Sequence, residues 1–202
     1  VITKKYAALC NYGGTFLIKK ADVKAKYNSV YAESGTVTIN DGVFRNYDDS
    51  ASYPVIYSEK ATVNLKGGMY ANSYWKKQAA IVYNKNGKIT ISGGRYTGTC
   101  ASIQNCASMN IKGGTFLSEN SPILQCEPRS TTTITGGELT SGSTISAIEL
   151  AQGRNKFSMT GGTLQTYSAM AFIICHGDDK NVTLDKKKVN LVGQNWTDIS
   201  VQ

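Results

Sequence analysis

The amino-acid sequence predicts an all-β fold in which short strands wind as a solenoid. One eight-residue phrase recurs along the chain, and within it apolar and polar residues alternate with a period of two. This period is typical of a β-strand, and self-similarity at about 20–50 residues is typical of a solenoid. The phrase reads VTINDGVF at 37–44, VNLKGGMY at 63–70, ITISGGRY at 89–96, MNIKGGTF at 109–116, TTITGGEL at 132–139 and FSMTGGTL at 157–164.

Degenerate copies open and close the series, with NYGGTF at 11–16 and VTLDKKKV at 182–189. The second turn residue of the phrase falls at positions 14, 42, 68, 94, 114, 137, 162 and 187. The repeat length predicts about eight coils over a single domain, residues 1–202.

Each coil is expected to hold three short strands. Two columns of the first strand should point inward, namely Val37, Val63, Ile89, Met109, Thr132, Phe157 and Val182, and Ile39, Leu65, Ile91, Ile111, Ile134, Met159 and Leu184. The Gly-Gly pair then allows a bend with positive φ. Another inward column follows it, at Phe16, Phe44, Tyr70, Tyr96, Phe116, Leu139, Leu164 and Val189. A third apolar segment recurs at 29–31, 55–57, 81–83, 102–104, 122–124, 147–149 and 172–174.

This pattern resembles the right-handed parallel β-helix proteins, the pectate-lyase-like superfamily in the broad sense. It is most similar to the Gly-Gly-Thr-Phe repeats of large bacterial surface proteins, and that tetrapeptide stands at 13–16 and 113–116. The resemblance covers nearly the whole chain and implies a secreted or cell-surface protein. It implies no single function, because the superfamily includes lyases, hydrolases, adhesins and spike proteins.

The net charge of +8 favours acidic partners such as an anionic polysaccharide, although a lysine-rich soluble surface would give the same value. We do not expect nucleic acid to be the partner, since charge is the only argument for it and no nucleic-acid-binding motif occurs. No run of 18 apolar residues is present, so no membrane-spanning helix is expected.

The five cysteines and the single histidine match no zinc pattern, and we expect no metal or cofactor. Cys106 follows Ile103 by three residues, and Cys126 follows Ile123 by three. The two cysteines are therefore expected at the same position of adjacent coils, either as a disulfide or as free thiols packed in the interior.

Candidate binding residues come from the connections of the first three coils. We expect these connections to be long and to project from the same edge. The first contains Lys19, Lys20, Asp22, Lys24, Lys26 and Tyr27; the second contains Arg45, Tyr47, Asp48, Asp49 and Tyr53; the third contains Tyr74, Trp75, Lys76 and Lys77. Aromatic rings stack on sugar rings, and charged groups hydrogen-bond to hydroxyl, uronate or sulfate groups. The alternative is that the aromatic residues cover the flank of the core and the lysines are merely solvated.

A tyrosine ladder would extend this patch. Tyr31, Tyr57 and Tyr83 are spaced by 26 and 26 residues, and alternation from their apolar neighbours predicts that they point outward. The predicted ligand-binding set is Tyr47, Asp48, Asp49, Tyr53, Tyr57, Tyr74, Trp75, Lys76, Lys77 and Tyr83.

No catalytic residues are predicted. Lyases of this fold stack acidic residues where the outward columns of the first strand here hold Thr, Asn and Ser. The segment His176-Gly177-Asp178-Asp179 fits a polar turn.

The sequence thus favours a non-catalytic, adhesin-like carbohydrate-binding module, secreted or on a bacterial surface. One alternative is a structural stalk or filament unit, with end-to-end self-association or flanking domains. The other is a polysaccharide lyase or glycoside hydrolase.

Overall fold

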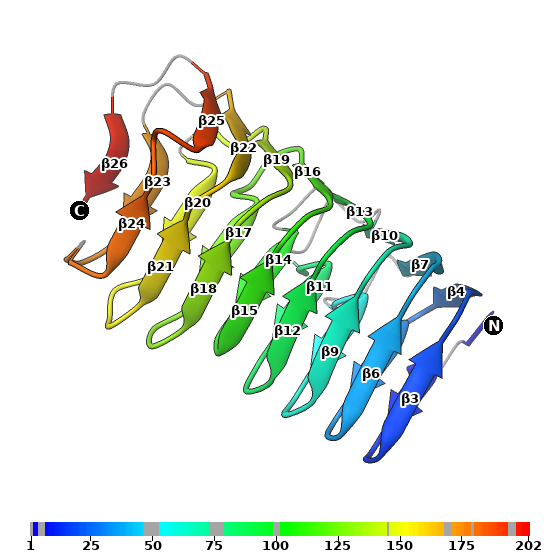
Figure 1. The fold of residues 1–202 in the computed structure, drawn as a ribbon. Coiled ribbons are helices and arrows are strands. Elements are labelled where there is room, and N and C mark those ends of the chain that lie inside the picture. The colour runs from blue at the N-terminus through cyan, green and yellow to red at the C-terminus, as the bar shows by residue number, and fades with distance from the viewer. Residues whose placement is uncertain are drawn as a thin grey trace.

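The fold is a right-handed parallel β-helix (Figure 1). The computed structural model describes residues 2–3, 7–46, 53–72, 79–98, 102–144, 146–167, 171–178, 180–193 and 197–202. Within these ranges the chain forms 26 strands, and no helix is long and apolar enough to cross a membrane. The all-β solenoid predicted from the repeat is confirmed.

Three parallel sheets run along the solenoid, two of nine strands and one of eight. Sheet A contains β1 (Ile2–Thr3), β4 (Ala21–Ala25), β7 (Gly42–Asn46), β10 (Met69–Asn72), β13 (Arg95–Gly98), β16 (Thr115–Ser118), β19 (Glu138–Ser141), β22 (Gly162–Thr166) and β25 (Val189–Val192). Sheet B contains β2 (Leu9–Asn11), β5 (Val30–Ala32), β8 (Ile56–Ser58), β11 (Val82–Asn84), β14 (Ile103–Asn105), β17 (Leu124–Cys126), β20 (Ile148–Leu150), β23 (Ala171–Cys175) and β26 (Thr197–Val201). Sheet C contains β3 (Thr15–Ile18), β6 (Thr36–Ile39), β9 (Thr62–Leu65), β12 (Lys88–Ile91), β15 (Ser108–Ile111), β18 (Thr131–Ile134), β21 (Lys156–Met159) and β24 (Val182–Leu184).

Each coil passes from sheet B to sheet C to sheet A, and each strand pairs in parallel with its counterparts on the neighbouring coils. Residues at the same position of successive coils therefore form columns, about 4.8 Å apart. The column predicted from Ile39 is confirmed, because Ile39 pairs with Leu65 and Leu65 pairs with Ile91.

The interior is a continuous stack of apolar side chains. Phe44, Tyr70, Tyr96 and Phe116 lie face to face along sheet A, with successive ring centroids 5.2, 4.7 and 4.6 Å apart. Buried phenols need hydrogen-bond partners. Tyr70 donates to the Gly67 carbonyl at 2.8 Å, and Tyr96 donates to the Gly93 carbonyl at 3.0 Å. The Gly-Gly turn therefore also satisfies the hydroxyl groups of the core.

The degenerate copies at both ends are placed differently from the prediction. Phe16 pairs with Val37 in sheet C, and the column of Phe44 begins at Val23 instead. At the other end Val189 pairs with Gly162. No apolar strand phrase precedes the first Gly-Gly pair, so that pair turns the chain into sheet C. The expected projecting connection at 19–27 is consequently occupied by β4.

The predicted equivalence of Cys106 and Cys126 is wrong. Leu124, and not Ile123, pairs with Ile103, so Cys126 faces inward beside Asn105 and Cys106 lies one position further on. Cys10, Cys106, Cys126 and Cys175 are all free thiols. Burial raises the pKa of Cys126 to about 12, which keeps this thiol protonated and inert.

Glycine turns hold adjacent coils in close contact. Gly42 has φ of +135°, and a Cβ there would lie 2.2 Å from the carbonyl oxygen of Ala21 on the preceding coil. Only glycine fits this position without moving the backbone.

We predict that Gly42→Ala lowers the free energy of unfolding by at least about 2 kcal/mol, from the strained φ and the backbone clash together. Urea denaturation followed by circular dichroism measures the loss. The control is Gly13→Ala, where a Cβ would meet only Ser34 Oγ at 3.7 Å, and its effect should stay below about 0.5 kcal/mol. Equal losses in the two variants would contradict this account of the turn.

Candidate functional site

A ladder of three tyrosines stands on the outer face of sheet B. Tyr31, Tyr57 and Tyr83 pair in register on consecutive coils, and the residues on either side of each are buried. Their ring centroids are 5.4 and 5.3 Å apart, with interplanar angles of 15° and 27°. The predicted outward direction is therefore confirmed.

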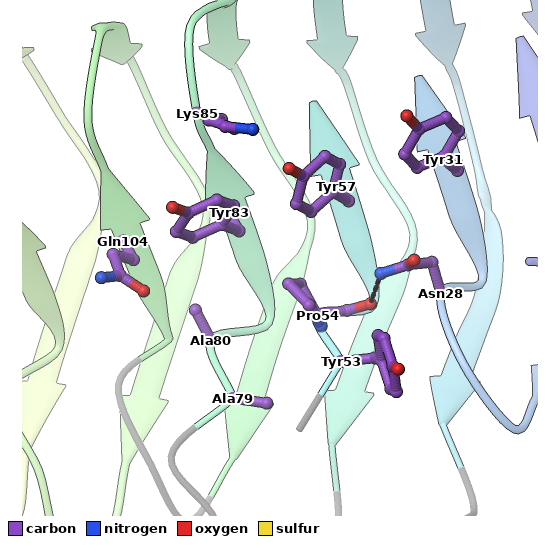
Figure 2. A pocket seen from close by; sticks show the side chains of 10 residues that line it. All are labelled: Asn28, Tyr31, Tyr53, Pro54, Tyr57, Ala79, Ala80, Tyr83, Lys85 and Gln104. Atoms are coloured by element: carbon purple, nitrogen blue, oxygen red, sulfur yellow. Dashed lines mark hydrogen bonds between the residues drawn. The ribbon is translucent and has the colours of Figure 1, made fainter. Parts of the chain in front are cut away.

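Stacking decides which parts of these rings can meet a ligand. Both faces of Tyr57 are covered, one by Tyr31 and the other by Tyr83. The ring edges and the hydroxyl groups remain available, and in Figure 2 the three hydroxyl groups point the same way. Burial raises the pKa of Tyr31, Tyr57 and Tyr83, so all three hydroxyls stay neutral at physiological pH.

An open groove of about 560 Å³ runs beside the ladder (Figure 2). It crosses β5, β8, β11 and β14, and so follows the solenoid axis. We call it the tyrosine groove; it is lined by Asn28, Tyr31, Tyr53, Pro54, Tyr57, Ala79, Ala80, Tyr83, Lys85 and Gln104.

Tyr53 differs from the ladder tyrosines. Its side chain is 44% exposed, and its ring meets Tyr27 at 80° with centroids 4.8 Å apart. An edge-to-face contact covers at most one face of a ring. Tyr53 therefore offers an aromatic face within the groove.

The tyrosine groove continues into a second cavity of about 460 Å³ towards the first coils. Asn28, Tyr31 and Tyr53 line both cavities. Cys10 and Tyr12 line the far end of the second. Together they form one elongated depression along sheet B.

Buried asparagines fix the bases of the two connections that border the tyrosine groove. Asn46 donates to the Tyr53 carbonyl at 2.8 Å, and Asn72 donates to the Ala79 carbonyl at 3.3 Å. Asn46 and Asn72 are register partners, so both connections start on adjacent coils at the same edge. This agrees with the predicted common edge for the second and third connections. Most of the predicted binding residues, namely Tyr47, Asp48, Asp49, Tyr74, Trp75, Lys76 and Lys77, lie outside the described residues.

A charged group borders the groove on its other side. Glu59 accepts hydrogen bonds from Lys85 at 2.9 Å and from Tyr57 at 2.7 Å. These bonds, that of Lys85 first, hold the pKa of Glu59 below its ordinary value. Lys85, whose own pKa is raised by the same bond, lines the groove as a cation.

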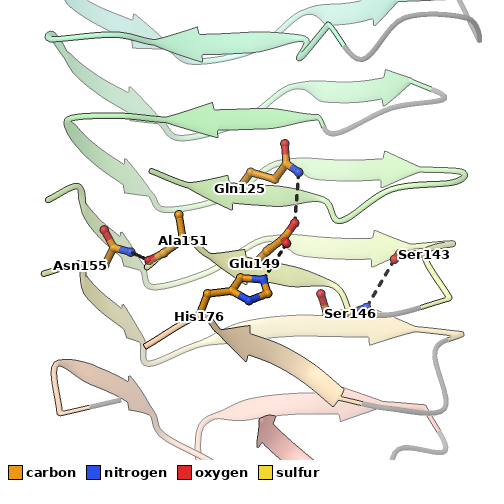
Figure 3. Close-up of polar contacts among 7 residues, drawn as sticks. All are labelled: Gln125, Ser143, Ser146, Glu149, Ala151, Asn155 and His176. Carbon is orange, nitrogen blue, oxygen red and sulfur yellow. Dashed lines mark hydrogen bonds and ion pairs between the residues drawn. The ribbon is translucent and has the colours of Figure 1, made fainter. Parts of the chain in front are cut away.

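Polar side chains continue along sheet B beyond the tyrosines. Gln104 donates to Glu127 at 2.8 Å. Figure 3 shows Glu149 between Gln125 and His176, which lie 3.2 and 2.9 Å from its two carboxylate oxygens. His176 follows β23 directly, at the start of the predicted polar turn. Within the described ranges, no group of three or more His, Cys, Asp or Glu residues could hold a metal ion.

Of the predicted binding residues, Tyr53, Tyr57 and Tyr83 line the tyrosine groove together. The predicted set does not include Lys85 and Gln104, although both could have been found from the coil length. Gln104 pairs with Tyr83 and so continues the ladder column, whereas Lys85 follows Tyr83 by two residues. Nothing in the repeat marks Asn28, Ala79 and Ala80, which come from the connections that enter sheet B.

Comparison with known proteins gives no relative: no family model, no curated protein and no solved structure matches the chain.

We predict that Lys85→Met raises the pKa of Glu59 more than Tyr57→Phe does, because the bond from Lys85 has the larger effect on that carboxylate. A group with a depressed pKa stabilises the fold at high pH, and this contribution is lost as the pH falls through its folded-state value. Both variants should therefore lose stability near neutral pH and none once Glu59 is protonated. Carboxyl-carbon NMR titration of Glu59 measures the pKa. An unchanged pKa in Lys85→Met would contradict the ion pair.

Proposed function

We propose that this chain is an extracellular, non-catalytic carbohydrate-binding module, and that the tyrosine groove binds a linear glycan along the solenoid axis. The observation that carries the proposal is an open, elongated groove combining neutral hydroxyl groups, carboxamides, one cation and one available aromatic face. This combination matches a ligand made of hydroxyl groups on an apolar ring scaffold.

The shape of the groove favours an extended polymer. Its lining repeats once per coil, about every 4.8 Å, because each tyrosine of the ladder belongs to a different coil. A chain of similar units lying along the axis would meet a similar set of groups at each step. A compact ligand would use only part of this surface.

The tyrosine hydroxyls support recognition of sugar hydroxyls. A neutral phenol has one donor and can accept as well. Tyr57 already donates to Glu59, and Tyr83 accepts from the Cys106 thiol at 3.6 Å. Tyr57 is thus left to accept from a ligand and Tyr83 to donate to one.

Tyr53 supports stacking. Of the groove tyrosines, it is the one whose ring is not part of the face-to-face ladder. An aromatic face next to polar groups can pack against the apolar face of a sugar.

The state of the nearby carboxylates supports binding without catalysis. Hydrolysis of a glycosidic bond needs one carboxyl group that is protonated near neutral pH to act as an acid. The pKa of Glu59 is shifted in the opposite direction, and both Glu59 and Glu127 are engaged by neighbouring side chains.

A bacterial origin, a place on the cell surface or in the secreted fraction, and membership of the pectate-lyase-like superfamily complete the proposal. Their support is the parallel β-helix together with the resemblance of the Gly-Gly-Thr-Phe repeats to those of bacterial surface proteins.

We predict that Tyr53→Ala weakens glycan binding about tenfold, equivalent to about 1.4 kcal/mol, because it removes the stacking face. A glycan array of neutral and acidic polysaccharides identifies the ligand, and isothermal titration calorimetry then measures the affinity. The matched control is Tyr167→Ala, which removes an exposed tyrosine (74%) located after β22, outside the groove.

Equal affinities for the two variants would show that the glycan binds elsewhere. No binding to any glycan on the array would overturn the proposal and favour a purely structural stalk or filament module. Release of unsaturated uronate or reducing ends from a bound polysaccharide would instead favour an enzyme.

A further inference from the structure

Two arginines stand one above the other at the corner where the chain passes from sheet B to sheet C. Thr131 pairs with Lys156, so Arg129 and Arg154 occupy the same position on adjacent coils. A hydrogen bond between the two residues that directly follow the arginines supports this alignment, since Ser130 Oγ donates to Asn155 Oδ1 at 3.4 Å. The two arginines are therefore about 4.8 Å apart along the axis at their backbones.

Both arginines line one cavity of about 760 Å³, together with Pro128, Gln152 and Gly153. No carboxylate lines it. Arg129 and Arg154 are exposed, and neither makes an ion pair or a side-chain hydrogen bond with any residue in the described ranges. Two like charges on adjacent coils repel each other, and no ion pair among the described residues compensates them.

The backbone conformation of Arg129 is a second unusual feature of this corner. The Ser130 amide donates to the Glu127 carbonyl at 3.1 Å, which closes a turn with Pro128 and Arg129 at its centre. Arg129 has φ of +67° and is the one non-glycine residue with positive φ in the described part of the chain. Proline followed by a residue with positive φ is the type II turn, in which glycine is the favoured third residue. The sequence thus keeps a guanidinium at a position where glycine would relieve backbone strain.

The floor of the cavity keeps the two turns in contact. A Cβ on Gly153 would lie 2.9 Å from Pro128 Cβ, so the two corners pack without a gap. Further positive charge lies alongside. Lys156 and Lys180 line a smaller neighbouring cavity of about 300 Å³ on the sheet C side, where Lys180 is paired with Asp178 at 3.9 Å.

We propose that Arg129 and Arg154 bind an oxyanion, the sulfate, phosphate or carboxylate group of an acidic ligand. A guanidinium presents parallel N–H donors that match two oxygens on one centre. One anion between two such groups removes their mutual repulsion and satisfies both. This site lies at the corners that follow β17 and β20, on coils that the lining of the tyrosine groove does not reach, and it does not depend on glycan binding there.

The test titrates the intact chain with four probes: inorganic sulfate, inorganic phosphate, a sulfated oligosaccharide and an oligogalacturonate. Arginine side-chain NMR signals report the site, and calorimetry at fixed ionic strength gives the affinity. We expect Arg129→Gln and Arg154→Gln each to weaken binding of the preferred probe at least tenfold. The matched control, Arg95→Gln, removes an exposed arginine from sheet A and should change the affinity less than twofold.

A second variant separates recognition from folding. Arg129→Gly suits the turn, so its unfolding midpoint should not fall below that of the wild type, whereas its oxyanion affinity should fall as in Arg129→Gln. Wild-type affinity in Arg129→Gly would overturn the proposal. So would losses in Arg129→Gln and Arg154→Gln no larger than in Arg95→Gln, or the absence of any shift with all four probes.

The probes also identify the source of the oxyanion. Equal affinity for an inorganic ion and an oligosaccharide would indicate a site for a free ion, and tighter binding of one oligosaccharide would indicate an acidic polymer. Tyr53→Ala should leave this binding unchanged. If the wild-type chain binds the oxyanion but no neutral glycan, the oxyanion site is supported and only the function proposed for the tyrosine groove is wrong.

Discussion

The rung-by-rung pairing of backbone groups between successive coils is the constraint on which the rest of the structure depends. Each strand is too short to be stable alone, and it gains its hydrogen bonds only from the coils before and after it. In-register pairing then turns any position of the coil into a column of neighbouring side chains. The aromatic stack of the core, the ladder of Tyr31, Tyr57 and Tyr83, and the aligned Arg129 and Arg154 all result from this one rule.

The same rule explains what the sequence could predict. The Gly-Gly phrase marks a fixed point in each coil, so the columns close to it, such as that of Ile39, were predicted correctly. The predicted register is wrong where the Gly-Gly phrase is distant or degenerate. Ile123 and Leu124 are both buried, so alternation alone could not decide which pairs with Ile103, and Cys126 was misplaced with them. Likewise, the constant spacing of Tyr31, Tyr57 and Tyr83 predicts the ladder, whereas Asn28 lies in a connection without a repeat and could not be predicted as a groove residue.

Stacking stabilises the tyrosine ladder and limits its chemistry at the same time. Rings packed face to face keep their shared faces out of water, so those faces cannot also stack on a ligand. Their edges and hydroxyls remain, arranged at the spacing of the coils. A residue outside the column escapes this restriction. Tyr53 comes from an irregular connection, and its ring packs edge-to-face on Tyr27 and is not part of the face-to-face ladder. The regular column of tyrosines thus supplies a repeated polar edge, and the irregular connection supplies an aromatic face at Tyr53.

The corner at Arg129 can be compared with the corner at Gly42 in terms of backbone strain. A solenoid spreads its stability over many similar columns, so strain confined to one turn does not endanger the fold. Gly42 occupies a corner where close backbone contact leaves no choice of residue, because the carbonyl oxygen of Ala21 fills the space of a side chain. At Arg129 the conformation favours glycine, yet an arginine side chain is retained and projects into open space. Backbone strain that no packing contact requires supports the oxyanion role that we propose for this side chain. The two corners therefore differ in kind: the backbone packing of the fold requires glycine at position 42, whereas it does not require arginine at position 129.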